Sequence, residues 1–401
     1  MLADFVKEIP EHDELESIIR SCVHCGFCNA TCPTYQLLGN ELDGPRGRIY
    51  LLKQALEGQP VSRLTQQHLD RCLTCRSCET TCPSGVRYGR LLDIGRTIVD
   101  KRAGRTLREQ IIRGLIKAVF PYRYRFSGLL HVARLIKPVL PKALKQKIPV
   151  KQRAAAWPNT GHARKMLILP GCVQQTLAPS IDTAAAQVLN KLGIALVKVQ
   201  DSGCCGALNY HLSDHHNALQ FARKNIDACW PYIEQGAEAI VITASGCGLM
   251  FKEYRELLKH DEDYAEKATR FSALAKDISE VVAAEDLTIF KADNRKIAFQ
   301  SPCTLQHGQK LTGVVEAILE KTGYQLAAVA DGHLCCGSAG VYSLLQPELS
   351  RQLLVNKLQA LEVNQPDIIA TANIGCLSHL QSSSSIKVVH WIELLGKATE
   401  M

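Results

Sequence analysis

The chain has 401 residues, 46 % of them hydrophobic and 21 % charged, a composition typical of a globular protein with two or three domains. Residues 1–20 lack the basic and then apolar pattern of a signal peptide, and no run of about 18 apolar residues follows, so we expect a cytoplasmic chain that does not span a membrane. Seventeen Cys in a reducing compartment indicate metal or redox chemistry rather than disulfides. The net charge of +8 conceals a basic segment, because residues 101–165 hold 17 Lys or Arg against one acid, Glu109.

Two cysteine runs dominate residues 1–100. The run CVHCGFCNATCP at residues 22–33 recurs as CLTCRSCETTCP at residues 72–83. Both match the C-x2-C-x2-C-x3-C-P spacing of two-cluster ferredoxins, in which three Cys hold one [4Fe–4S] cluster and the fourth reaches the neighbouring cluster. We therefore predict two clusters, one held by Cys22, Cys25, Cys28 and Cys82 and the other by Cys72, Cys75, Cys78 and Cys32.

The alternatives for these runs are zinc and disulfides, and both fit less well. Structural zinc usually takes two pairs of ligands separated by a longer loop, and disulfides do not suit a cytoplasmic chain. Helical patterns at residues 1–20, 46–56 and 66–72 place helices before and between the runs. The sequence therefore predicts an α-helical ferredoxin domain over residues 1–100.

The basic segment, residues 101–165, is expected to be a helical linker. Ile111, Ile112, Leu115, Ile116 and Val119 fall on one helical face, and Leu129–Leu140 repeats the pattern. Three interpretations stay open: a helical pair packed on the neighbouring domain with a solvated basic face, a dock for an acidic partner subunit, or an amphipathic surface on an anionic bilayer. Nucleic acid is not expected as a partner, because no recognised binding module accompanies the charge.

An internal repeat begins near residue 166. Its cysteines are Cys172, Cys204, Cys205 and Cys247 in the first copy and Cys303, Cys335, Cys336 and Cys376 in the second. The offsets between matched cysteines are 131, 131, 131 and 129 residues, and a Gly follows the Cys pair in both copies. Four matched cysteines at a nearly constant offset indicate a duplicated domain, which we place at residues 166–290 and 291–401.

Each copy alternates strand-like and helix-like segments, which favours a parallel sheet covered by helices. The predicted strands are Leu167–Leu169, Leu196–Val199, Ala239–Thr243, Ile297–Phe299, Leu326–Val329 and Ile368–Thr371, and predicted helices include Ile181–Leu192 and Val314–Lys321. The charged stretch Phe251–Phe290 is expected to form helices that join the copies. Each Cys group follows a strand, so the loops at the C-terminal edge of each sheet should bring four thiols together. The predicted fold class is α+α/β, a helical two-cluster domain followed by two α/β cysteine-rich domains with parallel sheets.

This order of motifs resembles the iron–sulfur subunits of bacterial glycolate oxidases nearly end to end, most clearly in CVHCGFCNATCPTYQLLGNELDGPRGRIYLLKQ, HLDRCLTCRSCETTCPSGVRY, SPCTLQHGQKL and HLCCGSAG. The resemblance implies an electron-transfer subunit without catalytic residues of its own. It also implies a partner subunit with FAD that oxidises glycolate to glyoxylate, and a second flavoprotein-like subunit. Electrons would leave toward the respiratory chain rather than NAD, with a quinone or the cytoplasmic face of the inner membrane as a further contact. The cluster subunits of anaerobic glycerol-3-phosphate dehydrogenase and of related 2-hydroxyacid dehydrogenases are the alternative.

The repeats are also similar to the cysteine-rich domain of heterodisulfide reductases, where five Cys hold a non-cubane cluster. Here Ala244 and Asn373 stand at the position of the fifth Cys, so each repeat offers four thiols. We expect one or two further iron–sulfur or redox sites there, and the alternatives are buried Cys that act only as small hydrophobes or a heterodisulfide-reductase-like enzyme. Cys229 has no counterpart and is expected in the core. Five histidines near the Cys loops are candidates for completing a site or relaying protons, although a lone His is more often only structural: His211, His215, His216, His307 and His333.

Overall fold

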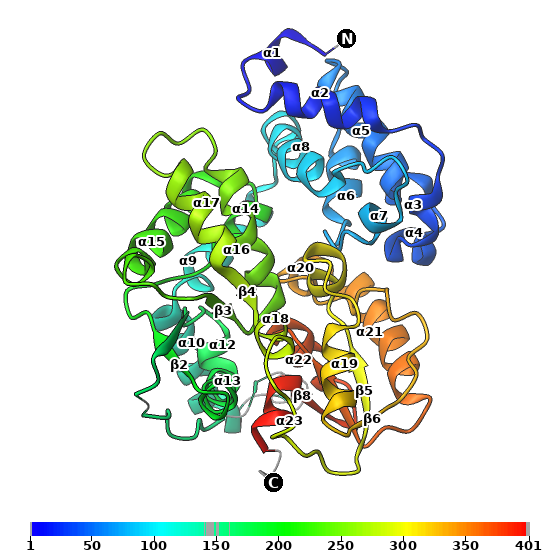
Figure 1. The fold of residues 1–401 in the computed structure, drawn as a ribbon. Helices are drawn as coiled ribbons and strands as arrows, with labels where there is room; N and C mark the ends of the chain where they lie inside the picture. Colours follow the sequence, from blue (N-terminus) through cyan, green and yellow to red (C-terminus); the bar gives the residue numbers. More distant parts are fainter. Residues whose placement is uncertain (1, 140, 142–147, 150–151, 160, 398–401) are drawn as a thin grey trace.

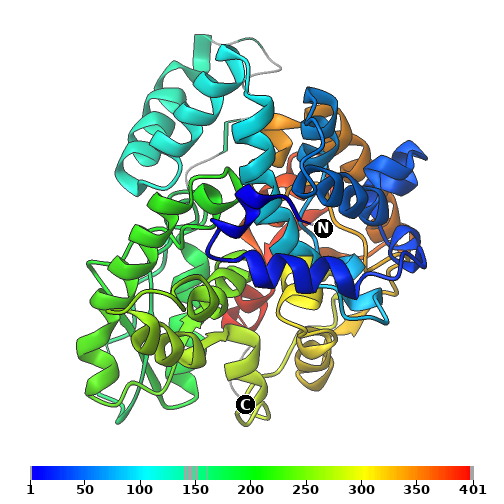
Figure 2. The same ribbon diagram turned by 90° about the horizontal axis from the view of Figure 1, so that it is seen from above.

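The structure is a computed structural model that describes residues 2–397 apart from residues 140, 142–147, 150–151 and 160. A helical N-terminal part stands on two α/β units that lie side by side, as Figure 1 shows from the front and Figure 2 from above. Both units contain parallel sheets. The predicted fold class is therefore confirmed.

The N-terminal part consists of short helices arranged around the two cysteine runs. They are α1 (Asp4–Lys7), α2 (His12–Ser21), α3 (Phe27–Ala30), α4 (Pro33–Leu38), α5 (Pro45–Leu56), α6 (Arg63–Asp70), α7 (Ser77–Thr81) and α8 (Tyr88–Ala103), with a 3-10 turn at Glu41–Asp43. Leu15, Leu52 and Leu91 pack fully buried between α2, α5 and α8. The helices predicted before and between the runs are thus present, and they hold the two cysteine loops against each other.

Each α/β unit is built on a four-stranded parallel sheet. The first unit contains β1 (Arg164–Ile168), α12 (Gln174–Leu177), α13 (Ser180–Lys191), β2 (Ile194–Lys198), α14 (Ala207–His211), α15 (His215–Glu234), β3 (Ile240–Ile242), α16 (Ser245–Leu257), α17 (Ala265–Leu274), β4 (Ala275–Asp277) and α18 (Ile278–Ala283). The second contains β5 (Lys296–Gln300), η3 (Thr304–Gly308), α19 (Val314–Lys321), β6 (Gln325–Leu326), α20 (Tyr342–Leu345), α21 (Pro347–Glu362), β7 (Ile368–Thr371), α22 (Ile374–Gln381), β8 (Lys387–His390) and α23 (Trp391–Lys397). The strand orders β2-β1-β3-β4 and β6-β5-β7-β8 are equivalent, which agrees with the duplication.

All six predicted strands are present, but each sheet has a fourth strand at its edge that was not predicted. Strand β4 has only three residues, Ala-Lys-Asp, and β8 follows a run of serines, so neither carries an apolar signal long enough to predict a strand. Strand β4 and helix α18 are the counterparts of β8 and α23. The stretch Phe251–Phe290 is therefore not only a helical joiner, since it completes the first sheet.

The two units share one hydrophobic core. Helix α13 of the first unit packs on α23 of the second, and the core joins Ile181 and Val282 with Trp391 and Leu395, all with at most 2 % exposure. A second cluster, containing Cys229, fills the outer face of the first sheet. The units therefore form one body, and the loops at the C-terminal edges of both sheets face the helical part above them (Figure 1).

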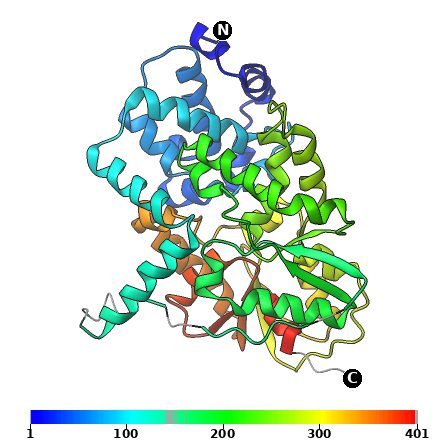
Figure 3. The same cartoon turned by 90° about the vertical axis from the view of Figure 1, so that its left-hand side faces the viewer.

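Helices α9 (Leu107–Val119) and α10 (Arg123–Ile136) form a hairpin on the outside of the molecule, coloured cyan to teal in Figure 3. A short turn at Lys137–Val139 follows, and the last residue of the predicted repeat of the pattern, Leu140, lies outside the described residues. The pair packs on the neighbouring part of the chain only with some of its apolar side chains, since Ile116, Phe126 and Leu130 are buried. Ile111 is 53 % exposed and Leu115 is 61 % exposed.

His390 links the two units and makes the stability of the fold depend on pH. Its Nε2 donates to the carbonyl oxygen of Thr243 at 2.8 Å, and complete burial lowers the pKa of His390 to about 4. An unfolded His takes up a proton near pH 6.5, so stability is complete above that pH and is lost as the pH falls toward 4. Urea unfolding should show a loss approaching about 3 kcal/mol between pH 7 and pH 4 from this group. His390→Gln should remove that part of the pH dependence, and an unchanged profile would contradict the assignment.

Candidate metal centres

The two cysteine loops adopt the same backbone conformation. His24 and Thr74, one residue before the second Cys of each run, both have φ 53°, and Gly26 and Arg76, one residue after it, have φ 86° and 61°. These left-handed residues turn the chain so that helices α3 and α7 start directly behind the loops. Non-glycine residues rarely accept such angles. The matched strain indicates that both loops are shaped to wrap their thiols around a centre.

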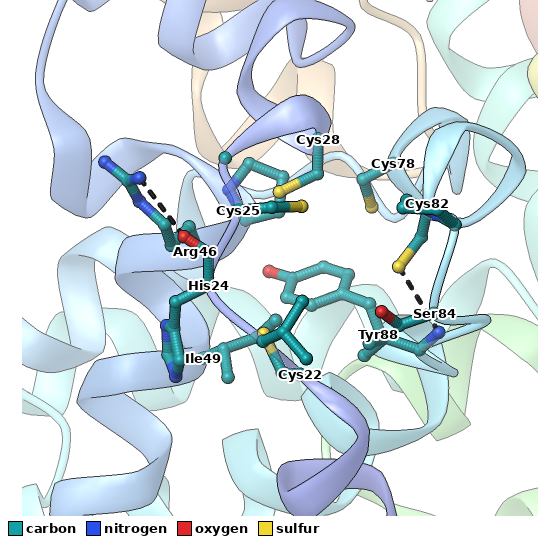
Figure 4. A pocket seen from close by; sticks show the side chains of 15 residues that line it. Cys22, His24, Cys25, Cys28, Arg46, Ile49, Cys78, Cys82, Ser84 and Tyr88 are labelled. Carbon is teal, nitrogen blue, oxygen red and sulfur yellow. Dashed lines mark hydrogen bonds between the residues drawn. The ribbon is translucent and has the colours of Figure 1, made fainter.

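The first loop borders a hollow of about 430 Å³, part of it open to solvent. Cys22, Cys25, Cys28 and Cys82 all line it, and Cys78 contributes to its wall (Figure 4). Cys25 is exposed, and burial raises the pKa of the Cys28 thiol to about 11. The four side chains predicted for cluster one therefore lie together, with the fourth supplied by the other run.

The second hollow has about 300 Å³ of free space, part of it open to solvent, and lies beside the first. Cys32, Cys72, Cys75 and Cys78 line it, so the last Cys of the first run lies beside the first three Cys of the second run. Cys78 borders both hollows. Within the described residues no group of three or more His, Cys, Asp or Glu side chains converges as the ligands of a single metal ion do.

The residues around both hollows fit iron–sulfur clusters. Cys thiolate is the ligand that such clusters take, and all seventeen cysteines are free thiols. Tyr88 lies in the wall of both hollows, and its hydroxyl is buried without a hydrogen-bond partner beside the thiols of Cys72 and Cys78. A sulfur-rich group in the hollow would give this hydroxyl the acceptor that it lacks. The assignment of each cysteine to a cluster remains a proposal.

The thiols of the first repeat meet at the C-terminal edge of its sheet, as predicted from the strand pattern. Cys204 contacts Cys172 and Cys205, and Cys205 also contacts Cys247. Hydrogen bonds from the Cys204 and Cys247 thiols hold the pKa of Cys205 well below its ordinary value. The hydroxyl of Tyr254 and the amide of Asn225 hold the Cys pair by donating to the carbonyl oxygens of Cys205 and Cys204 at 2.8 Å each.

The thiols of the second repeat form an equivalent series that adjoins the second ferredoxin loop. The sulfurs of Cys303 and Cys335 lie 3.9 Å apart, and further contacts join Cys335 to Cys336 and Cys336 to Cys376. Cys75 packs in the same small apolar cluster as Cys303 and Cys335. Burial raises the pKa of the Cys75 thiol, and Cys303 is the next largest cause. The second hollow and the second repeat are therefore direct neighbours.

The glycine of each Cys-Cys-Gly motif is required by its surroundings. Gly206 and Gly337 have φ 87° and 88°, and an added Cβ would lie 2.8 Å from the carbonyl oxygen of Ala218 and 2.7 Å from that of Ser350. These contacts align helices α15 and α21 with the Cys pairs.

We expect Gly337→Ala to lower the free energy of unfolding by about 2–5 kcal/mol, because it adds backbone strain and a clash with the backbone of helix α21. Gly340→Ala is the matched control. Gly340 also has a positive φ, 63°, but nothing lies within 4 Å of its Cβ position, so only about 1–2 kcal/mol should be lost. Chemical unfolding of both variants would measure the difference, and equal losses would contradict the role given to the contact.

Lys357 is a site residue that sequence analysis missed. It is 4 % exposed, its Nζ donates to the carbonyl oxygen of Asp331 at 2.9 Å, and it faces Cys335 and Cys336. Lys357 is seven residues after Ser350, as Asn225 is seven residues after Ala218, so the two occupy equivalent positions. The sequence signal that could have identified Lys357 is a Lys on the leucine-rich face of α21. The two duplicated sites thus differ by one buried Lys side chain, whose pKa is lowered by its burial.

The positions at which similar cysteine-rich domains have a fifth Cys are occupied by Ala244 and Asn373 in this chain. Ala244 is buried, and Asn373 caps helix α22 by accepting from the amide of Gly375 at 2.8 Å. Neither position supplies a thiol. Each repeat therefore brings together four thiols, as predicted.

The histidines have structural partners. His307 connects the second α/β unit to the helical N-terminal part. Its Nδ1 lies 2.9 Å from Thr80 Oγ1, and its Nε2 donates to the carbonyl oxygen of His333 at 2.9 Å. His211 pairs with the buried Asp93 at 2.9 Å, and His215 stacks on Tyr210. His216 contacts Gln220. No sequence signal marks Asp93, which ties α8 to helix α14, the helix that follows the first Cys pair.

Family comparisons match three segments of the chain. A model described as a 4Fe-4S dicluster domain matches residues 18–86, and one described as a cysteine-rich domain matches residues 166–252 and 297–381. Together these matches cover more than half of the chain.

Several curated proteins are similar over nearly the whole length. The glycolate oxidase iron-sulfur subunit of Escherichia coli K12 is 53 % identical over 96 % of this chain and 96 % of that protein. A probable glycolate oxidase iron-sulfur subunit of Bacillus subtilis is 30 % identical over 96 % of this chain and 94 % of its own length. Lactate utilization protein A of the same organism is 23 % identical over 58 % of this chain. A crystal structure of a hypothetical protein from Helicobacter pylori covers 98 % of this chain and 74 % of its own, with 11 % identity and a TM-score of 0.56, a likeness of fold alone.

Proposed function

The chain belongs to the family of glycolate oxidase iron–sulfur subunits, and from this premise we propose how it carries electrons. It is the electron-transfer component of a glycolate oxidase, an oxidoreductase complex. We infer that Cys22, Cys25, Cys28 and Cys82 hold one [4Fe–4S] cluster and that Cys72, Cys75, Cys78 and Cys32 hold a second. A bound cluster of this kind supplies a one-electron carrier.

The observation that supports this proposal is that each group of thiols lies next to another group. Cys78 borders both hollows, and Cys75 packs against Cys303 of the second repeat. The two repeats meet where Ser245 Oγ lies 2.7 Å from Thr304 Oγ1, next to Cys247 in α16 and Cys303 at the start of η3. We propose that the repeats hold one or two further iron–sulfur or redox sites on this path.

We propose that the oxidation of glycolate to glyoxylate takes place on a partner subunit with FAD, assisted by a second flavoprotein-like subunit. A flavin carries hydride chemistry that thiol-bound clusters do not supply, and no G-x-G-x-x-G motif for a dinucleotide follows a strand of this chain. We also propose that the complex works at the cytoplasmic face of the inner membrane and delivers electrons to the respiratory chain, with a quinone as acceptor.

The test is anaerobic purification of the complex, followed by iron and sulfide analysis and EPR before and after addition of glycolate. About eight irons for each copy of this chain correspond to the ferredoxin sites alone, and about 12 to 16 correspond to one or two further sites. The EPR signals should develop on addition of glycolate. A protein without iron, with zinc in its place, or with clusters that glycolate does not reduce would contradict the proposal.

A further inference from the structure

The hairpin of α9 and α10 has a partly inverted arrangement of side chains. In α9, Arg113 and Lys117 are partly buried and form ion pairs with Asp70 at 3.1 Å and Asp214 at 3.2 Å, and the more exposed Glu109 pairs with Arg63 at 2.7 Å. Ile116 is buried beside these charged side chains, but most of the other apolar side chains of α9 are exposed. A surface helix normally buries its apolar face and leaves its charges in water. This one instead leaves most of its apolar side chains in water and draws two of its basic side chains toward partly buried acids.

The exposed apolar surface continues over both helices. In α9 the exposed side chains are Leu107, Ile111, Ile112 and Leu115, and in α10 and the turn after it they are Leu129, Val132, Leu135, Ile136 and Val139. With Tyr122, which precedes α10, and Tyr124 in its first turn, this makes eleven of the 19 exposed large hydrophobic residues in the described chain. A patch of this kind marks an interaction site, because isolated apolar side chains are normal on a surface but a contiguous group is not.

The charge around this surface decides which partner fits it. Residues 107–139 carry seven Lys or Arg and one acid, Glu109, which is already paired with Arg63. Two of the seven, Arg113 and Lys117, are paired with Asp70 and Asp214, so five basic side chains are left to face a partner. Arg108 and Arg125 are exposed on the hairpin, and Arg123 and Arg125 lie over the rings of Tyr124 and Tyr122. Apolar side chains rimmed by Arg and Tyr are typical of helices that lie in the headgroup region of an anionic bilayer.

The hairpin lies on the outside of the molecule in Figures 2 and 3, so it can meet a flat surface without moving the rest of the fold. None of the helices described for this chain has the length and apolarity needed to cross a bilayer. We propose that the exposed face of α9 and α10 is a docking surface that lies on an anionic lipid bilayer. The inference rests on the proposed position of the complex at the membrane and names the surface that holds it there.

The test is sedimentation of the intact complex with vesicles of phosphatidylglycerol and phosphatidylethanolamine or of phosphatidylcholine alone. The wild type should bind the anionic vesicles, and Leu115→Glu/Leu135→Glu should weaken that binding by at least about tenfold. Both Leu side chains are exposed, at 61 % and 67 %, so the fold should tolerate the change. Leu344→Glu/Val363→Glu, with exposed side chains elsewhere, is the control and should bind as the wild type does.

The outcomes test the proposed docking surface and the proposed location of the complex separately. Binding by the wild type and the double variant alike would overturn the docking surface while leaving the proposed location in place. No binding by the wild type would overturn both. Loss of a partner subunit from the double variant, with vesicle binding unchanged, would identify the hairpin as a dock for an acidic protein and would also overturn the inference. Reduction of the clusters by glycolate in solution, which does not need a bilayer, should be the same in all variants.

Discussion

Cys75→Ala should abolish glycolate-dependent reduction of a dye downstream of this chain while bleaching of the partner's flavin by glycolate continues. Cys75 is a proposed ligand of the second cluster, and its side chain also packs against Cys303 and Cys335. The substitution therefore affects the second hollow and its contact with the second repeat together. Because both lie on the same path, a loss of at least about a hundredfold in dye reduction is expected, comparable to losing a metal ligand or its support.

The assay has to distinguish a broken path from an unfolded chain. Cys229→Ala is a suitable control, because Cys229 is fully buried, with burial raising its pKa to about 12, and lies in the outer core of the first repeat. It should lose about 1 kcal/mol of stability and retain dye reduction. Loss of flavin bleaching as well as dye reduction in Cys75→Ala would mean that Cys75 holds the complex together rather than carrying electrons.

The cysteine positions were predictable because spacing alone limits how a chain can wrap a cluster. The exchange of Cys32 and Cys82 between the two runs follows from such spacing, and the hollows are lined accordingly. The position of the second repeat beside Cys75 was not predictable, because no periodicity in the sequence records how separate domains pack. The same holds for the contact of His307 with Thr80.

The hairpin of α9 and α10 shows that an amphipathic pattern predicts a helix but not its orientation on the molecule. The apolar stripe of α9 was predicted correctly, but a stripe does not indicate which way it faces. Its direction is decided by Asp70 and Asp214, distant acids that draw Arg113 and Lys117 inward. Short edge strands were missed for a third reason, since β4 is held by its neighbour β3 and by the capping box of Asp277 and Glu280 rather than by apolar residues of its own.

A network of buried charged side chains lies behind the second hollow, and no sequence pattern predicted it. Arg48 is 1 % exposed, donates to the carbonyl oxygen of His68 at 2.8 Å and to Thr34 Oγ1 at 3.1 Å, and lies 3.6 Å from the carboxylate of Asp43. Asp43 is equally buried and also pairs with His68 and Arg71, each at 2.9 Å. Nothing in a helical pattern distinguishes Arg48 from a surface Arg. Its burial places a positive charge in the wall of the second hollow.

Arg48→Met should lower the free energy of unfolding by about 3–5 kcal/mol, because it leaves the buried carboxylate of Asp43 with one cation fewer and the carbonyl of His68 without its donor. Arg48 lines only the second hollow, so the iron content should fall by about four per chain, the amount in one cubane. Chemical unfolding and iron analysis would measure both effects. Arg87→Met is the control, since Arg87 is 53 % exposed and its ion pairs are worth at most about 1 kcal/mol. Equal stability of the two variants would mean that the network around Asp43 does not need its central cation, and loss of all iron would mean that the two hollows do not fill independently.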